Sequence, residues 1–119
     1  MDESEDGDKV SRRLADDVEA LNQAASLLGA MANPKRLQML MLLSQDEMSA
    51  GHLTKEVRLD QSAASQHLAK LRAAGLVETR REAQQIFYIC RSDKVSRLLV
   101  TLADIGNAQA VVRTQKDRS

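Results

Sequence analysis

Aromatic side chains are nearly absent from this sequence. The chain has 119 residues, of which 2% are aromatic, with one phenylalanine, one tyrosine and no tryptophan. A core must therefore be built from leucine, methionine, valine and alanine, and such residues favour packed helices over a β-rich fold. The length is sufficient for one domain with a modest core.

Cysteine and long apolar runs are also scarce. Cys90 is the only cysteine, so the chain cannot form an intramolecular disulfide framework. We interpret it as a small buried residue. No stretch is long or apolar enough to span a membrane, and the acidic N-terminus lacks the apolar region of a signal peptide. We therefore expect a soluble, cytoplasmic protein.

Neither charge is in surplus, because 17 Lys and Arg residues balance 17 Asp and Glu residues. Residues 1–8 carry five acids and no cation, whereas residues 34–91 carry nine cations and six acids, a net charge of +3. We interpret residues 1–10 as a disordered acidic tail, 11–110 as the folded domain and 111–119 as a flexible basic tail. An acidic arm with a binding role is the alternative for the first segment.

The first helical pattern covers residues 12–31. Its apolar positions are separated by alternating steps of four and three, as in a coiled-coil seam. They are Leu14, Val18, Leu21, Ala25 and Leu28. The pattern is compatible with a seam inside the domain and with a seam against a second copy.

Asn33 and Pro34 end that helix, and proline suits the first position of the next helix, which extends to Leu43. Lys35 and Arg36 lie at the N-terminus of this second helix, where cations oppose the helix dipole. A nearby phosphate or a neighbouring acid would offset the cost.

A helix-turn-helix pattern follows. Ser49 can cap a short helix over residues 50–57, and residues 58–60 form a tight turn. Asp60 can cap the second helix of the pair, and Gly75 suits the position just after its C-terminus. Its apolar stripe comprises Ala64, Leu68, Leu71 and Gly75.

The outer face of this second helix has short polar side chains, then small alanines at positions 69 and 73, with cations at its edges. A solvated face would carry more Glu and Lys, whereas this face suits a helix that enters the DNA major groove. Glutamine can pair with adenine, and serine can bond to several bases. We therefore expect base contacts from Gln61, Ser62, Ser65 and Gln66.

Two β-prone segments, residues 76–80 and 85–89, predict a hairpin whose connection, residues 81–84, is basic and amide-bearing. A basic hairpin after a helix-turn-helix is called a wing. We expect phosphate or minor-groove contacts from it, and ordinary solvated charge is the alternative for its arginines. The phosphate or wing candidates are Lys70, Arg72, Arg80, Arg81 and Gln84, with Lys35, Lys55 and Arg58 as weaker ones.

Ser92 can cap a last helix over residues 93–110. Its apolar face comprises Val95, Leu98, Leu99, Leu102 and Ile105. The whole pattern predicts a mainly α chain with a small β-hairpin.

Two strings, MANPKRLQMLMLL and DQSAASQHLAKLRAAGLVETRREAQQIFY, resemble the ArsR/SmtB family of winged-helix bacterial repressors. The resemblance covers residues 27–102. Its most specific part is Ser65 to Leu68, followed by Leu71–Arg72 and by residues 75–77. The ANPKRL opening and the TRREAQQIFY hairpin are most similar to the rhizobial nodulation-regulator branch.

The resemblance implies a winged helix-turn-helix protein that forms a homodimer through its first and last helices. It also implies a sequence-specific repressor whose partner is double-stranded DNA, in the form of an inverted-repeat operator overlapping a promoter. Two recognition helices would enter successive major grooves, roughly 34–36 Å apart. The expected dimer residues are Leu14, Val18, Leu21, Ala25, Leu28, Leu98, Leu99, Leu102 and Ile105.

The sequence departs from the family at its sensor sites. Ser49 and Gly51 replace the two cysteines of the metal-thiolate site, and the last helix has no histidine for the other metal site. A redox switch needs two cysteines. We therefore expect no metal and no cofactor, and the inducer stays unknown. We interpret His67 as a structural hydrogen-bonding group and His52 as a partner of Glu56, because no matching metal ligands are visible.

Two other classes of function compete with a repressor. A small helical adaptor would present apolar anchors in a groove, and the polar outer face argues against one. An enzyme is least favoured, because the chain has no glycine-rich phosphate loop and no nucleophile spaced with a base.

Overall fold

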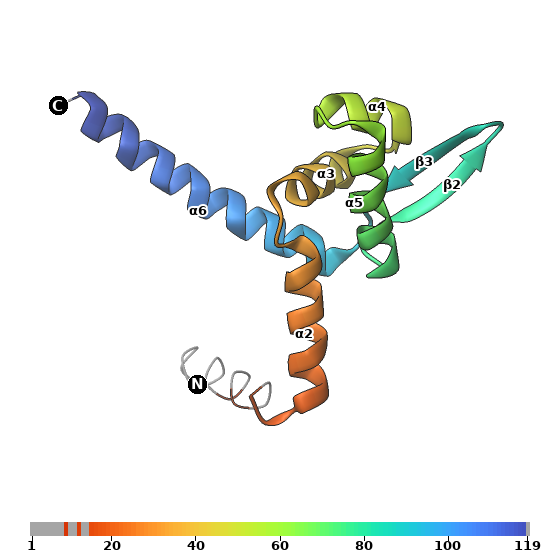
Figure 1. The fold of residues 1–119 in the computed structure, drawn as a ribbon. Coiled ribbons are helices and arrows are strands. Elements are labelled where there is room, and N and C mark those ends of the chain that lie inside the picture. Colours follow the sequence, from red (N-terminus) through yellow and green to blue (C-terminus); the bar gives the residue numbers. More distant parts are fainter. Residues whose placement is uncertain (1–8, 10–11, 13–14, 119) are drawn as a thin grey trace.

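The computed structural model describes residues 9, 12 and 15–118, and side chains among them up to residue 106. Its elements are α2 (Val18–Met31), α3 (Pro34–Gln45), β1 (Met48–Ser49), α4 (Ala50–Glu56), α5 (Gln61–Ala73), β2 (Glu78–Glu82), β3 (Gln85–Ile89) and α6 (Asp93–Arg118). Helices α3, α4 and α5 form the body, from which the β2–β3 hairpin, α2 and α6 extend in different directions (Figure 1). No helix in the described part of the chain is long and apolar enough to cross a membrane. The predicted mainly α winged helix-turn-helix is confirmed.

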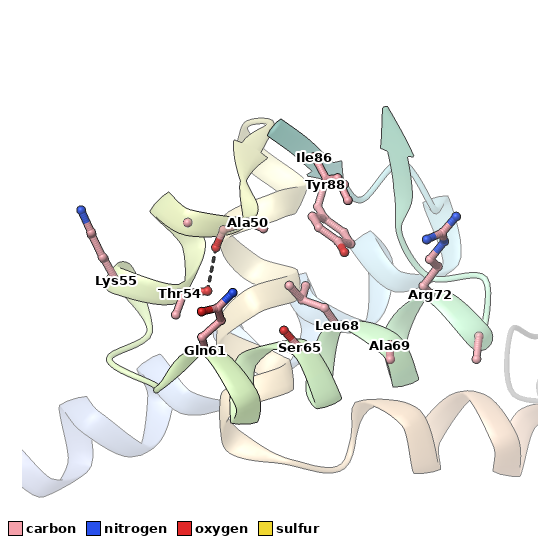
Figure 2. A pocket seen from close by; sticks show the side chains of 12 residues that line it. Ala50, Thr54, Lys55, Gln61, Ser65, Leu68, Ala69, Arg72, Ile86 and Tyr88 are labelled. Atoms are coloured by element: carbon pink, nitrogen blue, oxygen red, sulfur yellow. Dashed lines mark hydrogen bonds between the residues drawn. The ribbon is translucent and has the colours of Figure 1, made fainter. Parts of the chain in front are cut away.

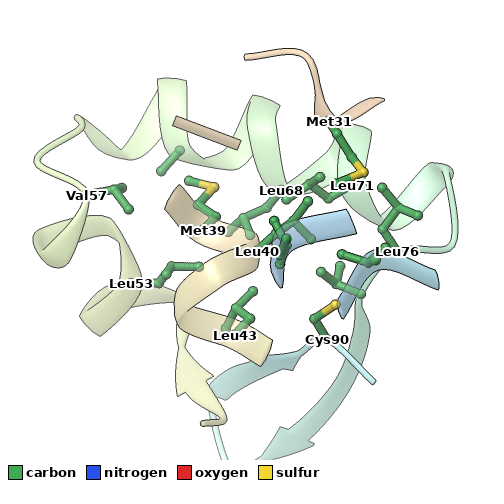
Figure 3. Close-up of a cluster of buried hydrophobic side chains, with 14 residues drawn as sticks. Met31, Met39, Leu40, Leu43, Leu53, Val57, Leu68, Leu71, Leu76 and Cys90 are labelled. Atoms are coloured by element: carbon green, nitrogen blue, oxygen red, sulfur yellow. The ribbon is translucent and has the colours of Figure 1, made fainter. Parts of the chain in front are cut away.

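The core is centred on α3 and contains no aromatic ring among its fully buried side chains. Met39, Leu40 and Leu43 of α3 are completely buried. They contact residues from α4, α5, the start of the wing and α6 (Figure 3). Each aliphatic side chain removed from water in this way contributes about 1.5–3 kcal/mol. Cys90 is buried in the same cluster, as predicted.

Side-chain caps fix where the helices of the helix-turn-helix and α6 begin. The Asp60 carboxylate accepts from the Ala63 amide (2.7 Å), and Ser49 Oγ accepts from the His52 amide (3.1 Å). Ser92 Oγ accepts from the Val95 amide (3.3 Å). Gly75 follows α5 with a φ of 72°, a left-handed conformation that favours glycine. The predicted helix starts are confirmed.

The three strands form one antiparallel sheet in the order β1-β3-β2. The predicted hairpin is present, but its first strand begins at Glu78 instead of Leu76. Leu76 and Val77 are both buried, and two consecutive inward residues are incompatible with the alternation of a strand. The turn is correspondingly shorter, with only Ala83 and Gln84 unpaired between the strands. Strand β1 was not predicted, since two residues show no periodicity.

Two helix boundaries differ from the expectation by more than one turn. The helix expected over residues 12–31 is interrupted at Asp17, whose carboxylate accepts from the Ala20 amide (3.0 Å) and caps α2. Such local capping competes with continuation of a helix. The last helix, expected to end near Ala110, continues to Arg118, because no glycine or proline follows Gly106. The predicted acidic tail lies outside the described residues apart from Lys9.

The Asp60 cap gives a stability prediction. We expect Asp60→Ala to lower the free energy of unfolding by about 1 kcal/mol, because the Ala63 amide loses its acceptor. Urea denaturation at a fixed protein concentration measures the change. Asp104→Ala, at an exposed position inside α6, is the matched control and should be close to neutral. Equal losses in both variants would contradict the cap's role.

Candidate nucleic-acid interface

An open groove of about 950 Å³ lies between α4, α5 and the wing (Figure 2). One wall is α5, which contributes Gln61, Ser65, Leu68, Ala69, Arg72 and Ala73. Helix α4 contributes Ala50, Gly51, Thr54 and Lys55, and β3 contributes Ile86 and Tyr88. The groove therefore has small and polar residues along α5, with Lys55 and Arg72 on its lining.

Helical spacing explains how α5 serves both the core and the groove. Ala64, Leu68 and Leu71 face the core and are buried. Gln61 and Ser65, one turn apart, are exposed and line the groove. The other two expected base contacts, Ser62 and Gln66, are exposed beside this row and do not line the groove. The structure thus brings two of the four base candidates into the groove and leaves two on its rim.

The register of the hairpin separates its two arginines. Arg81 pairs with Ile86, and Arg80 pairs with Phe87. Directly paired residues project from the same face of a sheet, and neighbours along a strand project from opposite faces. Ile86 lines the groove, so Arg81 lies on the groove face of the wing and Arg80 on the reverse face.

On that reverse face, Arg80 is bound to the protein itself. Its Nε donates to Glu47 Oε1 (2.7 Å), its Nη1 donates to Glu82 Oε2 (2.9 Å), and its guanidinium lies 4.4 Å from the centre of the Phe87 ring. The hydrogen bond from Arg80 lowers the pKa of the Glu47 carboxyl, and the two carboxylates raise the pKa of Arg80. Strand alternation turns Arg80 away from the groove, so its expected phosphate contact stays a prediction, which only the reverse face of the wing could make.

Lys35 also has a partner within the protein. Its half-buried Nζ donates to the carbonyl of Val57 (2.6 Å), the residue that caps the end of α4, so the ammonium already has an acceptor. Helix C-termini leave carbonyls without intrahelical partners, and this one offsets the poor placement of a cation at the start of α3. Neither a phosphate nor an acid is needed there.

The remaining candidates are placed as follows. Lys55 and Arg72 line the groove. Lys70 and Arg58 are exposed and lie outside it. Gln84 lines a smaller hollow of about 270 Å³ between the hairpin tip and the start of α4.

Sequence reasoning missed two polar residues that line the groove, Thr54 and Tyr88. Thr54 Oγ1 donates to the Ala50 carbonyl (2.7 Å), so its oxygen retains only acceptor capacity toward a ligand (Figure 2). Tyr88 is half-buried on β3 and borders the groove. Strand alternation between Ile86 and Tyr88 could have located it, once the inner face of the hairpin was known.

The two histidines have the structural roles that we predicted. His67 Nδ1 lies 3.2 Å from Arg36 Nη1, and His52 Nε2 lies 3.3 Å from Glu56 Oε1. Desolvation, followed by the positive charges of Arg36 and Lys70, lowers the pKa of His67. Within the described part of the chain, no group of three or more His, Cys, Asp or Glu residues is placed to hold a metal ion.

The expected dimer residues separate into two groups. Val18, Leu21, Ala25 and Leu28 on α2, and Leu102 and Ile105 on α6, are exposed. The expectation that Leu99 lies in the dimer interface is corrected, since Leu99 is only 5% exposed and belongs to the core of its own chain. Leu98 is half-buried against the same core. Leu14 lies outside the described residues.

Comparison with known proteins decides the family. Residues 33–79 match the family described as "Bacterial regulatory protein, arsR family". The nodulation protein NolR of Rhizobium meliloti is 56% identical over 82 residues, which are 69% of this chain and 67% of that protein. The chain belongs to the ArsR family. It is a DNA-binding transcriptional regulator and not an enzyme, and its predicted similarity to rhizobial nodulation regulators is confirmed.

Solved structures agree with this assignment. The crystal structure of NolR from Sinorhizobium fredii has a TM-score of 0.71 at 53% identity, covering 73% of this chain and 87% of that one. A solution structure from Mycobacterium bovis has a TM-score of 0.65 at 33% identity, covering 73% of this chain and 81% of that one. It is described as a homodimeric winged helix-turn-helix DNA-binding domain of a possible ArsR-family regulator.

The two wing arginines are expected to differ in their effect on DNA binding. We expect Arg81→Ala to weaken binding to duplexes of any sequence and to flatten the plot of log K against log salt, by about 0.9 for each phosphate that is no longer neutralised. Titrations of random-sequence duplex at several salt concentrations measure the slope. Arg80→Ala is the matched control: it removes the same charge from the reverse face, and its slope should equal that of the wild type. A flattened slope for Arg80→Ala alone would reverse our assignment of the two faces.

Proposed function

We propose that this chain acts in the cytoplasm as a homodimeric repressor that binds an inverted-repeat operator and blocks the promoter it overlaps. Each α5 would enter a major groove, and each wing would lie along the neighbouring backbone or minor groove. The observation that supports this proposal is the groove that Gln61, Ser65 and Arg72 of α5 line together with Ile86 and Tyr88 of the wing. Arg81 lies on the face of the wing turned toward them.

Base reading would come from the N-terminal half of α5. Gln61 is the first residue of this helix and carries an amide that can donate and accept together. Ser65 follows one turn later, and Ala69 is small enough to let the helix approach the edges of the bases. Ser62 and Gln66 would reach bases or sugars at the rim of the same contact.

Phosphate binding would come from cations at both ends of the groove. Lys55 from α4 and Arg72 from α5 line it, and Arg81 lies on the facing side of the wing. Lys70 is exposed on α5 and would reach the backbone beside the groove. Such contacts set affinity and register and carry no sequence information themselves.

Exposed apolar residues support a dimer. Val18 is 69% exposed on α2, and Ile105 is 51% exposed on α6. Leu21, Leu28 and Leu102 extend the same two surfaces. Both helices reach away from the body, where a second copy could cover them (Figure 1). Exposed apolar surface of this kind is typical of an interface.

Operator selection tests the reading helix. Duplexes selected from random DNA should contain two half-sites related by a two-fold axis, with centres about 10–10.5 base pairs apart or a multiple of that. Gln61→Ala should then weaken binding to the selected operator by about 1–3 kcal/mol while leaving random DNA unaffected. A change of equal size on both duplexes would refute the base-reading role, and selection of no common sequence would refute the proposed function.

Lysine substitutions in the proposed interface test the dimer. We expect Val18→Lys and Ile105→Lys to shift the protein toward monomers in sedimentation experiments, because each buries a lysine in the proposed interface. Val100→Lys is the matched control, since Val100 is 61% exposed on α6 but lies away from Leu102 and Ile105 around the helix. A monomeric wild type, or a dimer that only the control disrupts, would contradict this seam.

A further inference from the structure

Arg36 is the one buried charged side chain among the residues that the structure describes, at 8% exposure. Its Nε donates to the Ala30 carbonyl (2.7 Å) and its Nη2 to the Gly29 carbonyl (3.4 Å). Its Nη1 lies 3.2 Å from His67 Nδ1. The family assignment and the groove do not account for this residue, since it is neither exposed nor near the wing.

The partners of Arg36 belong to two elements with different tasks. Gly29 and Ala30 are in the last turn of α2, whose carbonyls carry the negative end of the helix dipole and attract a cation. His67 lies on α5, between the rim residue Gln66 and the core residue Leu68. One planar guanidinium therefore connects the helix that we assign to the dimer with the helix that we assign to base reading.

The contact requires one protonation state of His67. Arginine has only donors, so Nδ1 of His67 must accept, and the ring must be neutral with its proton on Nε2. The charged groups that lower the pKa of the ring are Arg36 from α3 and Lys70 from α5 itself, and both are cations. No ion pair between described residues includes His67. A proton on Nδ1 would face a donor and a like charge.

We propose that Arg36 and His67 are positioning residues that hold α5 in its DNA-reading orientation relative to α2, and that protonation of His67 releases this hold. This inference rests on the proposed function, because it assigns α2 to the dimer and α5 to the operator. In the dimer, two such links would set the separation and tilt of the two reading helices. Acidification would weaken operator binding even though it adds positive charge to a DNA-binding helix.

The environment of the imidazole determines the direction of the pH dependence. Burial and two neighbouring cations lower the pKa of His67 from 6.5. The folded, linked state therefore favours the neutral ring, and the link is complete above pH 6.5. As the pH falls below 6.5, the unlinked state binds the proton more readily, so the linked state loses stability relative to it. This loss of stability stops growing once the pH is below the pKa of His67 in the linked state.

The test compares three proteins on the selected operator between pH 8 and pH 5. Wild-type affinity should fall roughly tenfold on acidification, the loss expected for one charged-group hydrogen bond. His67→Gln keeps an acceptor for Arg36 but has no proton to gain, so its affinity should be independent of pH. His52→Gln removes the only other histidine, which is exposed, and should keep the wild-type dependence.

A second measurement does not require DNA. Amide NMR signals of Gly29, Ala30 and Met31 should titrate together with the His67 ring in the wild type and remain constant in His67→Gln. The link is refuted if wild-type affinity is constant or rises on acidification, or if the affinity of His67→Gln has the same pH dependence as the wild type. It is also refuted if the α2 amide signals do not change as the His67 ring titrates. Absence of operator binding at pH 8 would instead refute the proposed function, and the NMR titration would still decide the link.

Discussion

The first turn of α3 connects three neighbouring helices through hydrogen bonds to backbone atoms of α4 and α2 and a contact with a side chain of α5. Asn33 Oδ1 accepts from the amides of Lys35 (2.9 Å) and Arg36 (3.1 Å) and so starts the helix. The Lys35 side chain then binds the end of α4, and the Arg36 side chain binds the end of α2 and reaches His67 on α5. Two adjacent cations thus neutralise the negative ends of two neighbouring helices. These contacts tie α3 to α4 and to α5, the two helices that line the groove.

Alternation along β2 divides the cations of the wing between two tasks. Arg80 packs on Phe87 and joins Glu47, which precedes β1, to Glu82 at the end of β2. These are exposed ion pairs and add little to global stability, but they connect the hairpin to the segment that leads into α4. Arg81, one residue later, lies on the other face. Arg80 and Arg81 are chemically identical neighbours, and they differ in role because successive side chains of a strand point to opposite faces of the sheet.

Local signals in the sequence predicted the helix-turn-helix well, because caps and turns depend on residues close together in the chain. Ser49, Asp60, Gly75 and Ser92 all have the expected roles. The contacts that the sequence did not predict involve partners that are distant in sequence. Lys35 binds Val57, Arg80 binds Glu47, and Leu99 packs into the core, none of which a periodic pattern reveals. The break at Asp17 was also missed, since a regular heptad pattern continues across it.

The scarcity of aromatic residues has a practical consequence. Tyr88 is the only tyrosine of the chain, tryptophan is absent, and this single phenol borders the groove beside Ile86. Ultraviolet emission from the unlabelled protein therefore originates at the surface where nucleic acid would be bound. A ligand that enters the groove must change the polarity or the stacking around that phenol, so the wild-type chain contains an intrinsic optical reporter of occupancy at its own recognition surface.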